Sequence, residues 1–293
     1  MNKYLEKFLN YLEYEKNYSS NTVIAYKSNI EDLIKYLKDK NIEDIKSIDY
    51  DVIRNYLGYL YQKKYKAKSI SRMISSMRSF FKYLKLEAII DNNPMTLISN
   101  PKVEKKLPKY LTINDIEKIL SAPDMKDKVG IRDALILELL YVTGIRVSEL
   151  CNIKIDDLEI NEKRIKILGK GNKERYVLYG TRCSDLLKKY MSIRSLFIKI
   201  PIDYLILSKT GKKINPKEIR NIINRLKIKA GVDIAISPHT FRHTFATHML
   251  NEGADLRAVQ ELLGHENLST TTIYTHLTNE KLRRTYLDTH PRA

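Results

Sequence analysis

The residues with the clearest chemical potential lie in the second half of the chain. Six of them stand in this order: Arg146, Lys170, His239, Arg242, His265 and Tyr274. Arginine side chains can bind the oxygens of a charged phosphoryl transition state, a Lys or His can protonate a leaving oxygen, and a Tyr can attack phosphorus. Together, these residue types could cut a phosphodiester without a metal ion.

Arg146 has two possible roles. A guanidinium can bind two phosphate oxygens at once, which the ammonium of Lys cannot. Glu149 follows three residues later, and an Arg–Glu pair at this spacing is common on helices. Arg146 is therefore either a phosphate ligand or a structural partner of Glu149.

A second cluster begins at a predicted helix start. Ser237 and Pro238 have the residue types preferred at the N-cap and the first helical position. His239 then falls in the first turn, and Arg242 lies three residues later on the same face. Free N–H groups and the helix dipole favour a phosphate near such an end. His243 shares this face, and His239 could also be a residue that merely packs or caps there.

Lys170 and Tyr274 are ambiguous when taken alone. Lys170 lies on a predicted tight turn and could deliver a proton to a leaving oxygen, but Lys173 lies on the same turn. A phenol has a pKa of about 10, so Tyr274 would need neighbouring cations to act as a nucleophile. The histidines could instead bind zinc, and this alternative involves His239, His243, His265 and His276. Against zinc, the sequence has no HExxH and no paired CxxC, and two arginines would be superfluous beside a dication.

The full set resembles the tyrosine recombinase (phage integrase) family, and its Xer branch in particular. The resemblance covers nearly the whole chain and includes the ending His290-Pro-Arg-Ala293. It implies that Tyr274 is the nucleophile and that Glu149 orients the residues that act on the phosphate without acting on it itself. It also implies that five residues act on the phosphate, namely Arg146, Lys170, His239, Arg242 and His265. His243 would then be structural.

This resemblance implies a site-specific DNA recombinase that works through a 3′-phosphotyrosyl intermediate and needs no cofactor, metal ion or ATP. The implied role is resolution of chromosome dimers at segregation. A mobile-element integrase would use the same chemistry, and a type IB topoisomerase would use similar residues without pairing DNA sites. A non-catalytic architectural DNA-binding protein is the alternative from another class, and the intact residue set argues against it.

The implied partner is double-stranded DNA with a recombination site of two half-sites. Two such sites would be held by a homo- or hetero-tetramer whose C-terminal tails are exchanged between subunits. The sequence leaves open whether an activating DNA translocase takes part. The segment 281–287 carries an apolar set too short to form a helix alone, namely Leu282, Tyr286 and Leu287. It therefore needs a covering surface, on a neighbouring subunit or on its own domain.

The composition agrees with a polyanionic partner. The chain has 52 Lys and Arg against 35 Asp and Glu, a net charge of +17, which favours DNA or RNA. A source organism whose proteins are generally rich in Lys, Ile, Asn and Tyr would give a similar composition. Two Cys imply no disulfide framework, and we find neither a signal peptide nor an apolar run near the roughly 18 residues of a membrane span. We therefore expect a cytoplasmic protein without membrane contact.

The fold class expected is mainly α with a small antiparallel β-sheet. Apolar residues at helical spacing predict four helices in residues 1–98, around Leu5–Leu12, Ile30–Leu37, Ile53–Leu60 and Ile70–Leu84. The resemblance implies that this bundle is a SAM-like DNA-binding domain. Residues 99–110 are polar, contain two Pro, and are predicted to be an inter-domain linker.

Residues 111–293 are predicted to form an α+β catalytic domain. A helix should begin after Thr112, and 131–140 should be an apolar central helix. Alternating residues predict four strands, at 153–155, 164–168, 175–179 and 204–207. From residue 215 onward the pattern is again helical.

Overall fold

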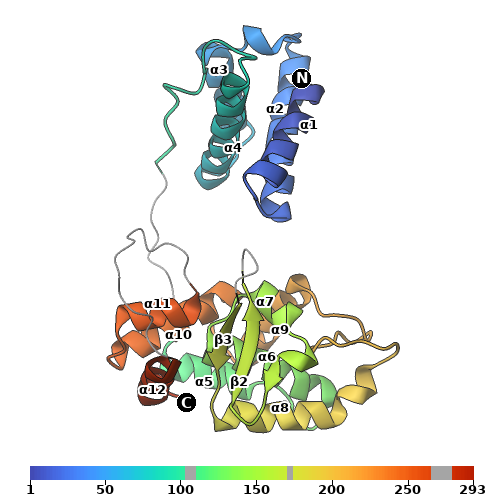
Figure 1. Ribbon diagram of the computed structural model, residues 1–293, viewed down its shortest axis with the longest axis vertical. Coiled ribbons are helices and arrows are strands. Elements are labelled where there is room, and N and C mark those ends of the chain that lie inside the picture. Colours follow the sequence, from blue (N-terminus) through green and yellow to red (C-terminus); the bar gives the residue numbers. More distant parts are fainter. Residues whose placement is uncertain (103–109, 170–173, 265–278) are drawn as a thin grey trace. The chain divides into compact units, whose positions relative to one another are not determined.

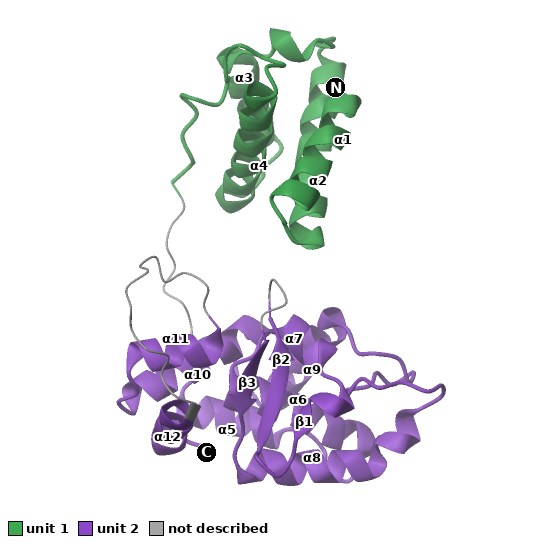
Figure 2. Cartoon of the chain, viewed as in Figure 1, with its two compact units in different colours: residues 1–106 green, residues 107–293 purple. Residues whose placement is uncertain are grey.

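The computed structural model describes residues 1–102, 110–169, 174–264 and 279–293 (Figure 1). The chain forms two compact units, residues 1–106 and 107–293 (Figure 2). Most of the predicted linker, residues 99–110, lies outside the described residues, so its character and the predicted domain limits stay predictions.

Unit 1 is a bundle of the four predicted helices. They are α1 (Asn2–Asn10), α2 (Ser20–Asp39), α3 (Tyr50–Gln62) and α4 (Ala67–Leu86). The apolar stripes face one another, and Phe8 packs edge-on against Phe80 with ring centroids 5.2 Å apart. Between α2 and α4, the buried Asn29 donates a hydrogen bond of 2.8 Å to Ser76. Ser19 stands at the N-cap of α2, although its side chain accepts no backbone hydrogen bond there.

Unit 2 is built around one deeply buried helix. Its helices are α5 (Ile113–Ser121), α6 (Lys128–Thr143), α7 (Val147–Asn152), α8 (Thr181–Ile193), α9 (Pro216–Lys229), α10 (Pro238–Asn251), α11 (Leu256–Leu263) and α12 (Asn279–Thr289). All side chains of α6 from Gly130 to Thr143 are buried, because α5, α7, α8, α9 and α10 pack around it. A helix that is apolar on every side belongs in such a core. The prediction of a central helix over 131–140 is therefore confirmed.

A small antiparallel sheet completes unit 2. Its strands β1 (Leu158–Glu159), β2 (Arg164–Leu168) and β3 (Glu174–Leu178) pair in the order of the sequence. Ile165 lies opposite Val177 in the register, and both side chains are buried. The fold is thus mainly helical with a small antiparallel sheet, as predicted.

Two of the predicted strands are wrong. At 153–155, Lys154 forms one isolated bridge to Tyr204, and the chain then turns into a 3-10 helix, Ile155–Asp157. The Asp157 carboxylate accepts a hydrogen bond of 2.8 Å from the Lys154 amide, which stabilises this turn. At 204–207, backbone carbonyls accept hydrogen bonds from the buried Arg194. The segment also pairs with other backbone, because the Leu205 amide donates to the Ile153 carbonyl at 2.8 Å and Leu207 forms an isolated bridge with Lys213. These isolated bridges stand in place of a continuous ladder.

The C-terminal helix α12 packs on α10 and α11 of the same chain. Tyr286 is buried there and Leu282 is partly buried, whereas Leu287 is exposed. The tail thus covers its own unit, which was the second of the two surfaces considered, and leaves Leu287 outside this contact. Exchange of the tail between subunits stays a prediction. Within the described residues, none of the helices has the length and apolar character needed to cross a membrane.

Candidate active site

Arg146 lies at a sharp turn between α6 and α7. The turn is made by Gly144, whose φ of +59° is a left-handed conformation that favours Gly. A Cβ at this position would lie 2.7 Å from side-chain atoms of Phe245 and Leu263. The turn thus fixes where the chain leaves α6, and Arg146 follows two residues later as the N-cap of α7.

Arg146 and Glu149 form the pair that the sequence suggested. The Arg146 amide donates to Glu149 Oε2 at 2.7 Å, and its Nη1 donates to Oε1 at 2.8 Å. Its Nη2 donates to the carbonyl of Gly264 at 3.3 Å. The side chain nevertheless stays 37% exposed. Arg146 is therefore both a structural partner of Glu149 and accessible to a ligand.

A third residue in this network, Arg175 on β3, was not among the site residues predicted from the sequence. Its Nη1 and Nη2 donate to the two oxygens of Glu149 at 3.0 and 2.9 Å. Burial by itself would raise the pKa of Glu149, but the hydrogen bonds and charge of Arg175, followed by those of Arg146, lower it below its usual value. The alternation of β3 could have indicated this contact, because Arg175 lies on the same face of the strand as the buried Val177. A charge on that face requires a buried partner.

Arg242 is held by the ends of two helices. Its Nη1 donates to the carbonyl of Gly144 at 2.8 Å, and its Nη2 donates to the carbonyl of Leu263 at 2.7 Å. Burial, followed by the positive charges of Arg146 and Arg175, lowers the pKa of Arg242 to about 10. The guanidinium is thus still charged at neutral pH. Arg146 and Arg242 bind the adjacent carbonyls of Gly264 and Leu263, so the structure brings these two arginines together.

The helix that carries Arg242 begins as predicted. The Ser237 hydroxyl accepts from the Thr240 amide, and Pro238 follows at the first helical position. An apolar stripe anchors this helix, because Phe241, Phe245 and Met249 are buried. His239 lies exposed in the first turn, and His243 contacts the ring of Tyr110 edge-on.

The remaining predicted site residues lie outside the described residues. These are Lys170, His265 and Tyr274, as well as the alternatives Lys173 and His276. Gly264, the last described residue before His265, ends α11 with a φ of +66°. Elsewhere in the described chain, no group of three or more His, Cys, Asp or Glu could hold a metal ion.

The described part of the site carries an excess of positive charge. The guanidinium groups of Arg146 and Arg175 bind the carboxylate of Glu149, and the positive charge of Arg242 interacts with the same carboxylate without a hydrogen bond to it. Three positive charges against one negative charge leave two uncompensated. Donors fixed in this way suit an anion such as a phosphodiester, because they need little reorganisation when charge develops on it.

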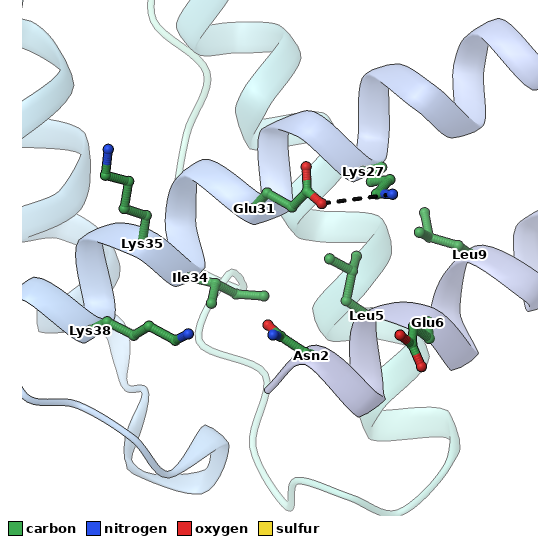
Figure 3. A pocket seen from close by; sticks show the side chains of 9 residues that line it. All are labelled: Asn2, Leu5, Glu6, Leu9, Lys27, Glu31, Ile34, Lys35 and Lys38. Atoms are coloured by element: carbon green, nitrogen blue, oxygen red, sulfur yellow. Dashed lines mark ion pairs between the residues drawn. The ribbon is translucent and has the colours of Figure 1, made fainter.

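Unit 1 offers basic grooves of its own. Figure 3 shows a groove between α1 and α2, with a volume of about 390 Å³, that is lined by three lysines and two glutamates. One of these lysines, Lys27, pairs with Glu31 at 3.9 Å. A groove of about 630 Å³ includes further cations, Lys16, Arg78, Lys82 and Lys85. The cations of both grooves suit the binding of a polyanion.

Comparisons with known proteins agree with this fold. Residues 5–88 match the phage integrase N-terminal SAM-like domain, and residues 109–281 match the phage integrase family. The chain is 43% identical to the tyrosine recombinase XerC of Anoxybacillus flavithermus, over 99% of this chain and 98% of that protein. It is 42% identical to the XerC of Bacillus subtilis, over 99% and 97% of the two chains.

Solved structures show the same architecture. The crystal structure of XerA recombinase is 32% identical, covers 100% of this chain and 99% of its own, and gives a TM-score of 0.52. The XerH site-specific recombinase bound to its difH substrate is 22% identical, covers 98% of this chain and 82% of its own, and gives a TM-score of 0.71. The chain therefore belongs to the phage integrase family, the tyrosine recombinases.

Proposed function

We propose that this chain is a site-specific DNA recombinase that resolves chromosome dimers at segregation, using Tyr274 to form a 3′-phosphotyrosyl intermediate. The observation that carries the proposal is the arrangement of Arg146 and Arg242 on the carbonyls of Gly264 and Leu263. The sequence that follows directly contains His265 and Tyr274. Similarity to XerC proteins over almost the full length of both chains supports the role in the chromosome.

The two arginines would bind the non-bridging oxygens of the scissile phosphate. A guanidinium has five N–H donors. In both arginines, Nη1 donates to one protein acceptor and Nη2 donates to another. Further N–H groups are thus left for phosphate oxygens. Because the protein already fixes both guanidinium planes, the transition state is stabilised without reorganisation.

The remaining roles follow the chemistry of transesterification. The Tyr274 oxygen bonds to phosphorus as the bond to the 5′-oxygen breaks, and its proton passes to a base, for which His239 is suited. Lys170 protonates the leaving 5′-oxygen, and His265 donates to a phosphoryl oxygen. A 5′-hydroxyl of the second duplex then attacks the phosphotyrosyl bond and releases Tyr274. One phosphoester replaces another at each step, so the reaction needs no ATP, and the fixed cations fill the role that a metal ion could have.

The partner would be double-stranded DNA carrying two half-sites. The net charge of +17 supports DNA binding. The related XerH and lambda integrase structures contain their DNA sites, and we infer for this chain a tetramer on two sites, formed with itself or with a second recombinase, and with exchanged C-terminal tails. A cytoplasmic location fits DNA chemistry, and the free, buried Cys151 and Cys183 suit a reducing compartment.

The test is adduct formation on a nicked duplex that carries the recombination site from the source chromosome. Wild-type protein should become covalently attached to the DNA, because the nick lets the leaving strand diffuse away. Tyr274→Phe should bind the duplex in a gel shift but form no adduct. Adduct formation by the Phe variant would exclude Tyr274 as the nucleophile, and binding without any wild-type adduct would indicate an architectural DNA-binding protein.

Excision between two copies of the site then separates the chromosomal role from that of a mobile element. Wild-type protein should recombine sites from the chromosome of its source. Recombination confined to the ends of a mobile element would contradict dimer resolution and leave the chemistry intact.

A further inference from the structure

Arg175 is the member of the arginine cluster to which the proposed reaction assigns no role. Its side chain is 15% exposed and makes a bidentate pair with Glu149. Its Nε is buried and has no hydrogen-bond partner among the described residues. Bidentate pairs of this kind fix direction as well as distance. Arg175 therefore determines the plane of the Glu149 carboxylate.

Arg175 also lies against the second group that holds Arg146. A Cβ on Gly264 would lie 3.0 Å from Arg175 Cδ and 3.2 Å from its Cζ. The Gly264 carbonyl is the acceptor for Arg146 Nη2. Arg175 thus contacts both the carboxylate and the peptide unit that orient Arg146.

The charge of Glu149 depends on the same contact. Burial alone would raise the pKa of this carboxyl, and Arg175 opposes that effect more strongly than Arg146 does. Arg242, from α10, adds a third positive charge nearby. When Arg146 engages a phosphate, Arg175 remains as the counter-charge that keeps Glu149 ionised.

We propose that Arg175 is a positioning residue for DNA cleavage, which orients Arg146 by fixing the ionised carboxylate of Glu149 and supporting the peptide of Gly264. The proposal rests on the proposed function, because it concerns the geometry of the phosphate-binding arginine. Removing Arg175 should let Arg146 shift, and a misplacement of about 1 Å can cost about 10²-fold in rate.

The chain offers a matched control on the neighbouring strand. Arg164 on β2 also binds a carboxylate, with its Nε 2.6 Å from Glu159 Oε2, and it lies over the ring of Tyr176. Arg164→Met therefore removes an Arg–carboxylate pair from the same sheet without touching Glu149. Arg175→Lys keeps the charge but loses the bidentate geometry.

The first measurement is single-turnover cleavage of the nicked duplex at saturating protein. We expect Arg175→Met to cleave about 10²-fold more slowly with DNA affinity unchanged, Arg175→Lys to remain slow, and Arg164→Met to cleave like the wild type. Equal rates for Arg175→Met and Arg164→Met would overturn the proposal. So would full activity of Arg175→Lys, because the bidentate contact would then be unnecessary.

The pH profile separates positioning from general support of the fold. Burial raises the pKa of Glu149, and in Arg175→Met less positive charge opposes this effect, so the pKa of Glu149 should rise. Once protonated, the neutral carboxyl no longer holds Arg146. Cleavage should then decline on acidification at a higher pH than in the wild type. This decline should disappear when Glu149→Gln is added. A uniform loss of rate at every pH would mean that Arg175 only supports the sheet.

A measurement without DNA keeps the two proposals distinguishable. In full-length protein labelled with ¹³C-glutamate, the Glu149 carboxyl should titrate at a higher pH in Arg175→Met than in the wild type and in Arg164→Met. An unchanged titration would overturn the role of Arg175. A wild-type protein that forms no adduct would instead overturn the proposed function, while this titration would still decide whether Arg175 controls Glu149.

Discussion

Replacing Arg292 should destabilise unit 2 more than its place next to the end of the chain suggests. The Arg292 side chain is 5% exposed, and its Nη1 donates to Glu138 Oε2 at 2.7 Å. Glu138 lies on the central helix α6, is 3% exposed, and has a second oxygen without a hydrogen-bond partner among the described residues. Burial raises the pKa of Glu138, and Arg292 partly opposes that effect. Removing one partner of such a buried pair costs about 3–5 kcal/mol, which is the loss expected for Arg292→Met.

Urea unfolding followed by circular dichroism measures this loss. Arg283→Met is the matched control, because Arg283 lies 3.4 Å from Glu162 in a pair where both side chains are about half-exposed. Such a pair contributes about 0–1 kcal/mol. Adding Glu138→Gln to Arg292→Met should recover much of the loss, since no charge is then buried without a partner. A loss below about 1 kcal/mol for Arg292→Met would refute the reasoning.

Three further outcomes follow from the site and from the buried tail. Arg242→Lys should cleave about 10²–10³-fold more slowly in single-turnover assays, and a near-normal rate would mean that Arg242 only positions the phosphate. A 5′-bridging phosphorothiolate, whose leaving group needs no proton, should restore cleavage to Lys170→Ala but not to Arg146→Ala, and equal rescue would remove Lys170 as the acid. Burial lowers the pKa of His290 to about 3, below its unfolded value of about 6.5. The unfolded chain therefore binds the proton first, and stability should fall by up to about 1.4 kcal/mol per pH unit between pH 6.5 and 3. His290→Phe should flatten this slope in urea unfolding at several pH values, and an unchanged slope would contradict it.

Features that depend on near neighbours were predictable from the sequence. Ser237 was identified as the N-cap of α10, and its hydroxyl accepts from the Thr240 amide. The pairing of Arg146 with Glu149 followed from a spacing of three residues. Each of these depends on helical periodicity or capping, which act within a turn or two.

Features that join distant segments could not be predicted in this way. Arg242 binds the carbonyl of Gly144, 98 residues away, and Arg175 binds Glu149 from 26 residues away. Periodicity reports which face of an element is buried but not which distant group meets it. For the same reason 204–207 was predicted to be a strand, since periodicity does not show that its pairing is limited to isolated bridges with Lys154 and Lys213.

The identity of the nucleophile is tested most directly by locating the DNA on the protein. Wild-type protein trapped on a nicked duplex would be digested with trypsin and nuclease, and the peptide that carries the nucleotide would be sequenced by mass spectrometry. Cleavage after Arg257 and Lys281 releases residues 258–281, in which Tyr274 is the single Tyr. We predict a nucleotide linked through phosphate to Tyr274. A nucleotide on any other residue, or no adduct from wild-type protein that binds the site, would contradict the proposed mechanism.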